Sequence, residues 1–238
     1  MNAHKLIITF VILFSVAVLQ AQENMGKAWL LSPGARDSLL TPDVKARLGI
    51  RFPVFKAYTY TDKSGEYCVV LTERSYKPRE KETDFNDTIQ AFCFTKKGAD
   101  LSPYWSLRDF ILKGGDNRSE ETSIWFFSKF MLFDDLDNDG KVDPVVVYGT
   151  TADNGSDDGR IRILVYYKGQ KRAIRHQNSP YDGGRYTKVD AEYYDLPQSI
   201  QTRVLKVMED LYEADRAIFP AGYKEKMKLK KTSFDEKK

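Results

Sequence analysis

The sequence predicts an α+β fold dominated by β-structure, in which an antiparallel β-meander sheet is covered by one C-terminal helix. Two observations carry this prediction. Short segments rich in β-branched and aromatic residues recur along the chain between polar turns, and the chain contains 14 Tyr and 14 Phe. A single long stretch of helical apolar spacing lies near the C-terminus, where it can cover one face of a sheet.

The helical stretch spans residues 197–214. Its apolar positions recur every three or four residues, at Ile200, Val204, Val207, Met208 and Leu211. A second, short helix is expected at residues 42–48, because Thr41 is a good N-cap, Pro42 suits the first helical position and Gly49 suits the C-cap.

Strand patterns occupy most of the remaining chain. The expected strands cover residues 51–60, 66–73, 89–95, 124–133, 145–150, 161–167, 171–176 and 189–194. Residues 124–133 are apolar at almost every position, which predicts a strand covered on both faces. Residues 96–115 fit either a short helix or a buried connection.

The two ends of the chain differ in composition from its middle. Residues 1–22 combine Lys5, an apolar run and a small-residue end at Ala21, which predicts a secretory signal peptide whose apolar run is too short to span a membrane. We therefore expect a periplasmic or secreted protein with no transmembrane segment in the mature chain. Residues 23–215 should form a single β-rich domain, and residues 216–238 a charged tail. That tail is either disordered or an anchor for an anionic surface.

Charge and histidine content exclude several functions. Without Lys5, 36 of the 37 basic residues remain against 34 acidic residues, so the chain lacks the strong positive field that nucleic-acid binding needs. The mature chain has one histidine, His176, which excludes multi-histidine zinc sites and weakens Ser-His-Asp and Cys-His catalytic readings. A lone histidine at a strand end is more often structural.

The most informative motif is D-x-D-x-D-G-x-x-D, which lies between two apolar segments. Its predicted metal ligands are the side chains of Asp135, Asp137, Asp139 and Asp143 and the backbone carbonyl of Lys141. Calcium is a hard cation that takes six to eight oxygen ligands, so alternating carboxylates before a glycine suit it well. An acidic hairpin turn without a metal is the alternative, because Asp-Gly and Asn-Asp are common in turns.

The flanks of this motif distinguish it from an EF-hand. An EF-hand loop ends in a bidentate Glu at its twelfth position and lies between helices, whereas here that position is Val146 and both flanks favour strands. The motif instead resembles the calcium loops of FG-GAP and VCBS repeats in integrin-type propellers. Only one copy is present, and a propeller needs several blades, so the resemblance covers the loop and not the propeller fold.

Two cysteines, Cys68 and Cys93, lie in neighbouring predicted strands. An antiparallel register that pairs them would place the turn near Glu80 and allow a cross-strand disulfide, which persists in exported proteins. Two buried free thiols that act as small apolar residues are the alternative.

Longer runs of the chain are similar to a family of exported proteins of Gram-negative bacteria labelled surface polysaccharide biosynthesis protein. The matching runs are residues 58–71 (YTYTDKSGEYCVVL), 130–147 (FMLFDDLDNDGKVDPVVV), 171–176 (KRAIRH) and 195–211. The family has D-G-x-x-E after the loop where this chain has Asp143, and Arg-Gly where this chain has Arg175-His176. The label implies envelope glycan biology without naming a reaction.

These observations predict a non-catalytic, calcium-binding β-protein that binds or supports surface glycan or another envelope protein. For a binding module, the residues expected to contact the ligand are Tyr104, Trp105, Tyr181 and Tyr186; their alternative role is packing in the core or in turns. A glycan hydrolase that uses a pair of carboxylates about 5–10 Å apart is the alternative function. A purely structural envelope protein should show neither feature.

Overall fold

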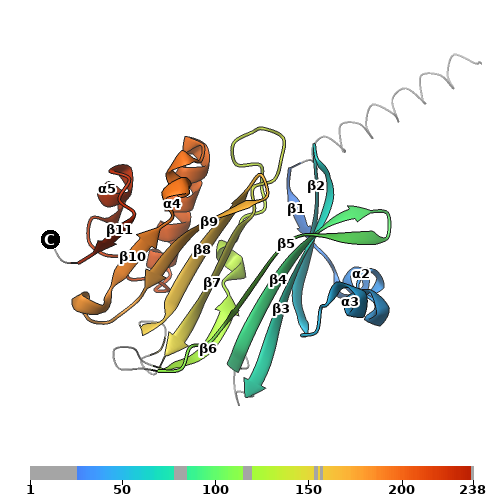
Figure 1. The fold of residues 1–238 in the computed structure, drawn as a ribbon, viewed down its shortest axis with the longest axis horizontal. Helices are drawn as coiled ribbons and strands as arrows, with labels where there is room; N and C mark the ends of the chain where they lie inside the picture. Colours follow the sequence, from blue (N-terminus) through green and yellow to red (C-terminus); the bar gives the residue numbers. More distant parts are fainter. Residues whose placement is uncertain (1–25, 78–84, 115–119, 153–154, 156–157, 237–238) are drawn as a thin grey trace, which may run out of the picture.

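A computed structural model describes residues 26–77, 85–114, 120–152, 155 and 158–236. The predicted signal peptide lies outside the described residues. The structure confirms the predicted class, β-dominated α+β with antiparallel strands, but the strands form two sheets rather than one (Figure 1). No helix in the described part of the chain is long and apolar enough to cross a membrane.

The N-terminal sheet has five strands, and their order in the sheet is the same as their order in the chain. They are β1 (Ala28–Leu30), β2 (Val54–Asp62), β3 (Gly65–Lys77), β4 (Phe85–Lys97) and β5 (Asp100–Phe110). Between β1 and β2, the short helices α2 (Pro33–Leu39) and α3 (Pro42–Leu48) cover one face of this sheet. Helix α3 confirms the capping prediction, since the Thr41 side chain accepts a bond from Val44 N–H and Gly49 adopts φ 71°.

The C-terminal sheet has six strands in the order β11-β10-β9-β8-β7-β6. Its strands are β6 (Glu121–Phe126), β7 (Val145–Ala152), β8 (Arg160–Tyr167), β9 (Gln170–Gln177), β10 (Tyr186–Val189) and β11 (Ser233–Asp235). The helical elements of this half are the 3-10 turns η1 (Ser128–Phe130), η3 (Asp182–Gly184) and η4 (Ala191–Asp195), and the helices α4 (Gln198–Glu213) and α5 (Tyr223–Lys228). Helix α4 buries all five apolar residues that its spacing predicted.

One hydrophobic core joins the two sheets. It combines Val69 and Leu71 of β3 with Val145 and Val147 of β7, and it continues to the buried face of α4. The sheets meet where β4 lies against β6, and there the Ser123 hydroxyl accepts a hydrogen bond from Asn86 N–H at 2.8 Å. The two sheets therefore belong to one domain.

Four predicted elements are wrong in detail. The predicted strand at residues 189–194 is instead the last residue of β10 followed by the 3-10 turn η4. Residues 96–115 contain β5 rather than a helix. The predicted strand at residues 124–133 ends at Phe126, and η1 separates it from an extended segment that joins β7 only through a bridge between Leu132 and Val145. The tail is ordered over residues 216–236, because Met227 and Phe234 are buried and anchor α5 and β11 to the C-terminal sheet.

The disulfide prediction is also wrong, and a shift of one residue in register explains why. Cys68 lies opposite Phe94, and Cys93 lies opposite Val69. Neighbouring positions along a strand point to opposite faces, so Cys93 faces the core between the sheets while Cys68 faces α2 and α3. Both are buried free thiols, and burial raises the pKa of each to about 12.

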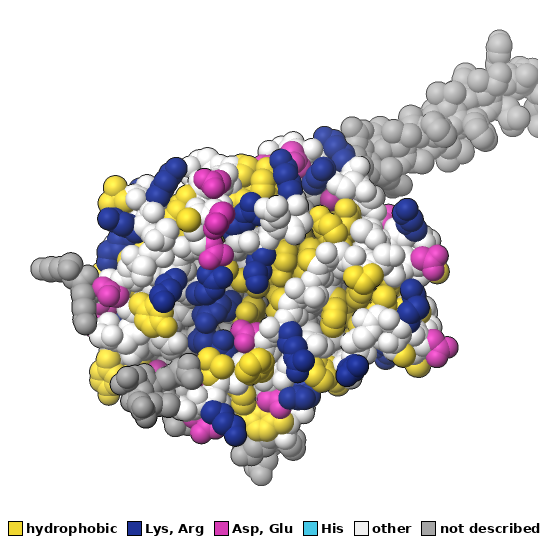
Figure 2. All heavy atoms as spheres, in the orientation of Figure 1, with side chains coloured by type: hydrophobic (Ala, Val, Ile, Leu, Met, Phe, Trp, Pro, Cys, Tyr) yellow, Lys and Arg dark blue, Asp and Glu magenta, His cyan; other side chains and the backbone are white. Residues whose placement is uncertain are grey.

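The space-filling view shows Lys and Arg side chains gathered over the central strands of the C-terminal sheet (Figure 2). The register contributes a row of three cations to this sheet, because Arg162, Arg175 and Lys188 lie opposite one another on β8, β9 and β10. Like charges in this arrangement repel each other. Asp190 offsets part of the repulsion by pairing with Arg175 at 2.5 Å.

Candidate metal centre

The acidic loop, residues 134–144, lies between the turns of two hairpins that belong to different sheets. On the side of the N-terminal sheet, Lys63 N–H donates to the Gly140 carbonyl at 2.9 Å, and Val142 N–H donates to the Asp62 carboxylate at 3.0 Å. On the side of the C-terminal sheet, the Tyr167 hydroxyl donates to Asp137 Oδ2 at 3.0 Å. The loop is thus in contact with both sheets.

Two residues allow the tight path of this loop. Asn138 adopts φ 59° and Gly140 adopts φ 89°, both in the left-handed region that Asn and Gly tolerate best. A Cβ at Gly140 would lie 2.2 Å from a side-chain carbon of Lys63, so any larger residue would displace that side chain. The glycine of the motif therefore serves both the turn and the close approach of β2–β3.

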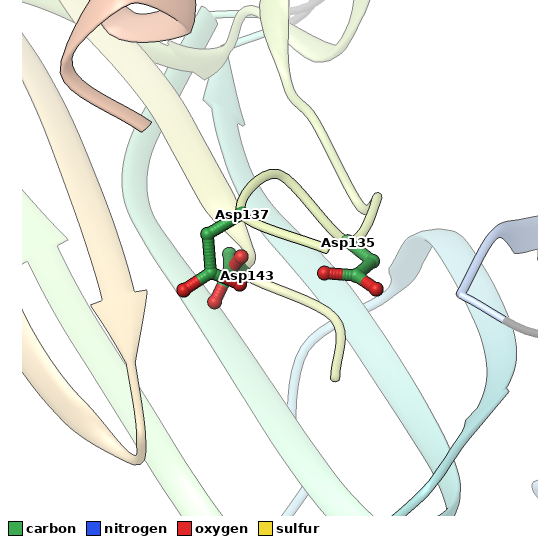
Figure 3. Close-up of side chains that lie close together, drawn as sticks. All are labelled: Asp135, Asp137 and Asp143. Carbon is green, nitrogen blue, oxygen red and sulfur yellow. The ribbon is translucent and has the colours of Figure 1, made fainter. Parts of the chain in front are cut away.

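Three carboxylates of the loop converge. Ligand oxygens of Asp135, Asp137 and Asp143 all lie within 4.8 Å of one another (Figure 3). Calcium–oxygen distances of about 2.3–2.6 Å place two oxygens on opposite sides of one ion about 5 Å apart, so this spacing fits a shared ion. Among the described residues, no Lys or Arg forms an ion pair with these three carboxylates. The group could therefore hold a metal ion.

Asp143 is the buried member of the group, with only 2% of its surface exposed. Burial raises the pKa of Asp143 to about 7, and the negative charges of Asp137, Asp139 and Asp135 add to this rise. A hydrogen bond from Leu136 N–H at 3.0 Å acts in the opposite direction because it stabilises the carboxylate. A bound cation would stabilise the charged carboxylate and so oppose this rise.

Two predicted ligands have other surroundings. The Asp139 carboxylate accepts a bond from Lys141 N–H at 2.9 Å and lies 3.9 Å from Lys168 Nζ, so it is not part of the converging group. The role of the Lys141 carbonyl stays a prediction. Sequence reasoning missed Asp62, which is 7% exposed and holds the loop through Val142 N–H; its turn sequence gave no sign of a second role.

A small cavity of about 30 Å³ adjoins the loop at Asp143. The stacked rings of Trp105 and Tyr166, with centroids 3.9 Å apart, line it. Trp105 Nε1 and the Tyr166 hydroxyl are buried, and no described residue hydrogen-bonds to either. The cavity is large enough for one water molecule, which could form hydrogen bonds with these two groups and with the Asp143 carboxylate. It is too small for a sugar ring.

The four aromatic residues predicted to bind ligand do not share one surface. Tyr104 and Trp105 follow each other on β5 and line the small cavity, where a β-bulge opposite Cys93 turns them toward the C-terminal sheet. Tyr181 is 77% exposed and precedes η3, and Tyr186 is 43% exposed on β10. The ligand-binding role of these residues stays a prediction.

His176 has the surroundings of a structural residue. It is 1% exposed, and its two ring nitrogens lie 2.9 Å from Thr187 Oγ1 and 2.7 Å from Asn178 Oδ1. Burial lowers the pKa of His176 to about 4. The ring is therefore neutral at physiological pH and fully hydrogen-bonded within the C-terminal sheet.

No protein-family model, no curated protein sequence and no solved structure matches this chain. The resemblances drawn from the sequence motifs therefore stay predictions.

Proposed function

We propose that this chain is an exported, non-catalytic, calcium-binding β-protein that binds or supports surface glycan or another envelope protein. The observation that supports the metal part is the convergence of Asp135, Asp137 and Asp143 within 4.8 Å in a loop that contacts both sheets. Export is supported by the signal-like pattern of residues 1–22. The envelope partner is supported only by the family resemblance of four sequence runs.

The donor set favours calcium over other common metals. All three converging donors are carboxylate oxygens, whereas zinc sites favour Cys and His. Magnesium demands near-octahedral geometry at about 2.0–2.1 Å and retains several waters, whereas calcium accepts irregular cages of protein oxygens. The small cavity beside Asp143 could supply a further oxygen ligand as water.

In this function the ion acts as a link between the sheets. It would compensate the charges of the three carboxylates and fix a loop that hydrogen-bonds to the β2–β3 turn and to Tyr167 at the end of β8. At a dissociation constant of ~0.1 mM and ~2 mM calcium, binding would stabilise the folded chain by roughly 1.8 kcal/mol. A domain with a net stability of about 5–15 kcal/mol would feel that contribution.

Terbium luminescence tests the metal site directly. Terbium(III) occupies calcium sites and emits strongly when a neighbouring phenol ring transfers energy to it, and the Tyr167 hydroxyl lies 3.0 Å from Asp137 Oδ2. The mature chain should therefore give terbium emission that calcium suppresses by competition. Tyr167→Phe should reduce the emission while a calorimetric titration still detects calcium binding.

Two matched variants make this test specific. Asp137→Asn removes one converging carboxylate and should abolish calcium binding, whereas Asp100→Asn, which alters an exposed carboxylate at the start of β5, should bind as the parent does. If the parent produces no calcium-sensitive emission and no heat of calcium binding, the proposal fails. Equal binding by the two variants would also contradict it.

A further inference from the structure

A groove of about 560 Å³ opens on the face of the N-terminal sheet that is turned away from the C-terminal sheet. Its floor consists of Thr59 and Thr61 of β2, Glu66 of β3 and Lys96 of β4. Trp29 of β1 lies opposite Thr59 and is 53% exposed. The volume of the groove lies within the roughly 300–1,000 Å³ that small-ligand sites occupy.

The groove exists because α2 and α3 cover only part of this face. Under the helices the sheet presents buried apolar residues such as Ala57, Val70 and Phe94. Two positions further along the same strands, the residues are Thr59 and Lys96, which α2 does not cover. Side chains two apart on a strand share a face, so the floor continues the covered surface with polar chemistry. Leu39 of α2 then forms an apolar wall beside it.

The lining combines an aromatic side with a polar floor and has no net charge. Among its described lining residues, Glu66 and Lys96 are the charged ones, and they pair at 2.6 Å. A sugar ring has the matching chemistry, because its C–H face stacks on an indole while its hydroxyls bond to hydroxyl and charged side chains. We infer that this groove binds a neutral oligosaccharide, with Trp29 as the stacking residue.

The acidic loop holds the strand that carries Trp29. One edge of β1 pairs with β2, and the other edge lies against the start of this loop and the residue before it. Ala28 N–H donates to the Phe133 carbonyl at 3.1 Å, and Asp135 N–H donates to the Gly26 carbonyl at 3.0 Å. Asp135 is also one of the converging carboxylates. A three-residue edge strand has few bonds of its own, so fixing Asp135 with an ion fixes the aromatic wall of the groove. This second step rests on the proposed calcium site.

Calorimetric titration of the mature chain, residues 23–238, tests the inference with maltohexaose, cellohexaose and chitohexaose as neutral probes and hexagalacturonate as a charged one. In calcium, at least one neutral hexasaccharide should bind. Trp29→Ala should weaken that binding about ten-fold or more, as truncation of an aromatic anchor does. Tyr212→Ala, which removes an aromatic residue that is 57% exposed on α4, should leave it unchanged. Chelating calcium should weaken binding about five-fold or more, in the range of typical coupling between sites.

Separate readouts distinguish the groove from the metal site. Trp29→Ala should retain calcium-sensitive terbium emission, because Trp29 is not among the converging ligands. The groove assignment is overturned if no neutral hexasaccharide binds, if only hexagalacturonate binds, or if Trp29→Ala binds as the parent does. Metal binding without any effect of the chelator on sugar binding overturns the coupling. Sugar binding that depends on Trp29 in a chain that binds no metal overturns the proposed calcium site and the coupling, and supports the groove.

Discussion

Replacing Asp143 with Asn should raise the stability of the calcium-free protein and abolish its response to calcium. Asp143 is 2% exposed, and burial, together with the charges of the neighbouring loop carboxylates, raises its pKa to about 7. Without an ion at pH 8, its carboxylate is nevertheless charged. The amide has almost the same shape and keeps an oxygen that can accept the bond from Leu136 N–H. The substitution therefore removes the charge and leaves the local hydrogen bond in place.

The size of both effects follows from the structure. A pKa raised from 3.8 to about 7 corresponds to at most roughly 4 kcal/mol of destabilisation by the charged Asp143 at pH 8. Calcium at ~2 mM should add roughly 1.8 kcal/mol to the parent. For a chain of this size one kcal/mol shifts Tm by about 2–4 °C, so calcium should raise the parent's Tm by about 4–7 °C. Its effect on Asp143→Asn should be about zero.

Thermal melts followed by circular dichroism at pH 8, in EDTA and in calcium, measure both quantities. Asp100→Asn serves as the control, since it removes an equal charge from an exposed position outside the loop. Its Tm and calcium shift should match those of the parent. A calcium shift that survives in Asp143→Asn would refute Asp143 as a ligand. Equal calcium-free Tm values for parent and Asp143→Asn would refute the energetic cost assigned to its charge.

Three more predictions follow from the described contacts. In EDTA, the Tm of Asp143→Asn should exceed that of the parent by about zero near pH 4 and by the largest amount above pH 7. The reason is that the folded parent binds more protons than the unfolded chain across this window, so the parent loses stability as pH rises. A difference in Tm that does not change with pH would contradict this. The unfolded, unreduced protein should react as two free thiols, Cys68 and Cys93, in a thiol-quantification assay, and a reductant should leave Tm unchanged. Glu121→Ala should lower the free energy of unfolding, measured by denaturant titration, by about 3–5 kcal/mol, because it removes the buried partner of Arg160. Asp210→Ala, which removes an exposed ion pair with Lys206, should lower it by less than about 1 kcal/mol.

Local patterns predicted some elements of this fold well. The spacing of α4 identified Ile200 and Met208 as buried, and the Thr41 and Gly49 caps located α3, because both signals lie within a few residues of the helix that they specify. The D-x-D-x-D-G-x-x-D spacing likewise identified a loop whose carboxylates converge. Each of these signals is contained in one continuous segment.

Features that depend on distant residues were not predictable in this way. Whether Cys93 meets Cys68 depends on one residue of register between β3 and β4, which the sequence of either strand leaves open. The groove has no local signal in the sequence, because Trp29 and Lys96 are far apart in the chain and line the same groove only as a result of the strand order β1 to β4. In the tail, the apolar residues Met227 and Phe234 are isolated among lysines, so the charged composition concealed their burial.

Two acidic clusters among the described residues differ in whether the chain itself supplies a cation. Both lie beside β7 and connect the sheets. At one end, Glu121 and Asp109 of different sheets bind the same guanidinium, Arg160, at 2.5 and 3.2 Å. That cluster therefore contains its own cation and is satisfied by the chain alone.

At the other end of β7, the acidic loop gathers Asp135, Asp137 and Asp143, and the nearby lysines engage Asp139 instead. Lys63 Nζ donates to the Asp139 carbonyl at 3.0 Å, and Lys168 Nζ lies 3.9 Å from its carboxylate. The converging carboxylates thus lack the internal partner that Arg160 gives Glu121. Backbone N–H groups and the Tyr167 hydroxyl donate hydrogen bonds to these carboxylates, but none of these donors carries a full positive charge. A cation is therefore the partner that we propose for this cluster. The difference between these two clusters is the physical reason to expect a metal in the acidic loop.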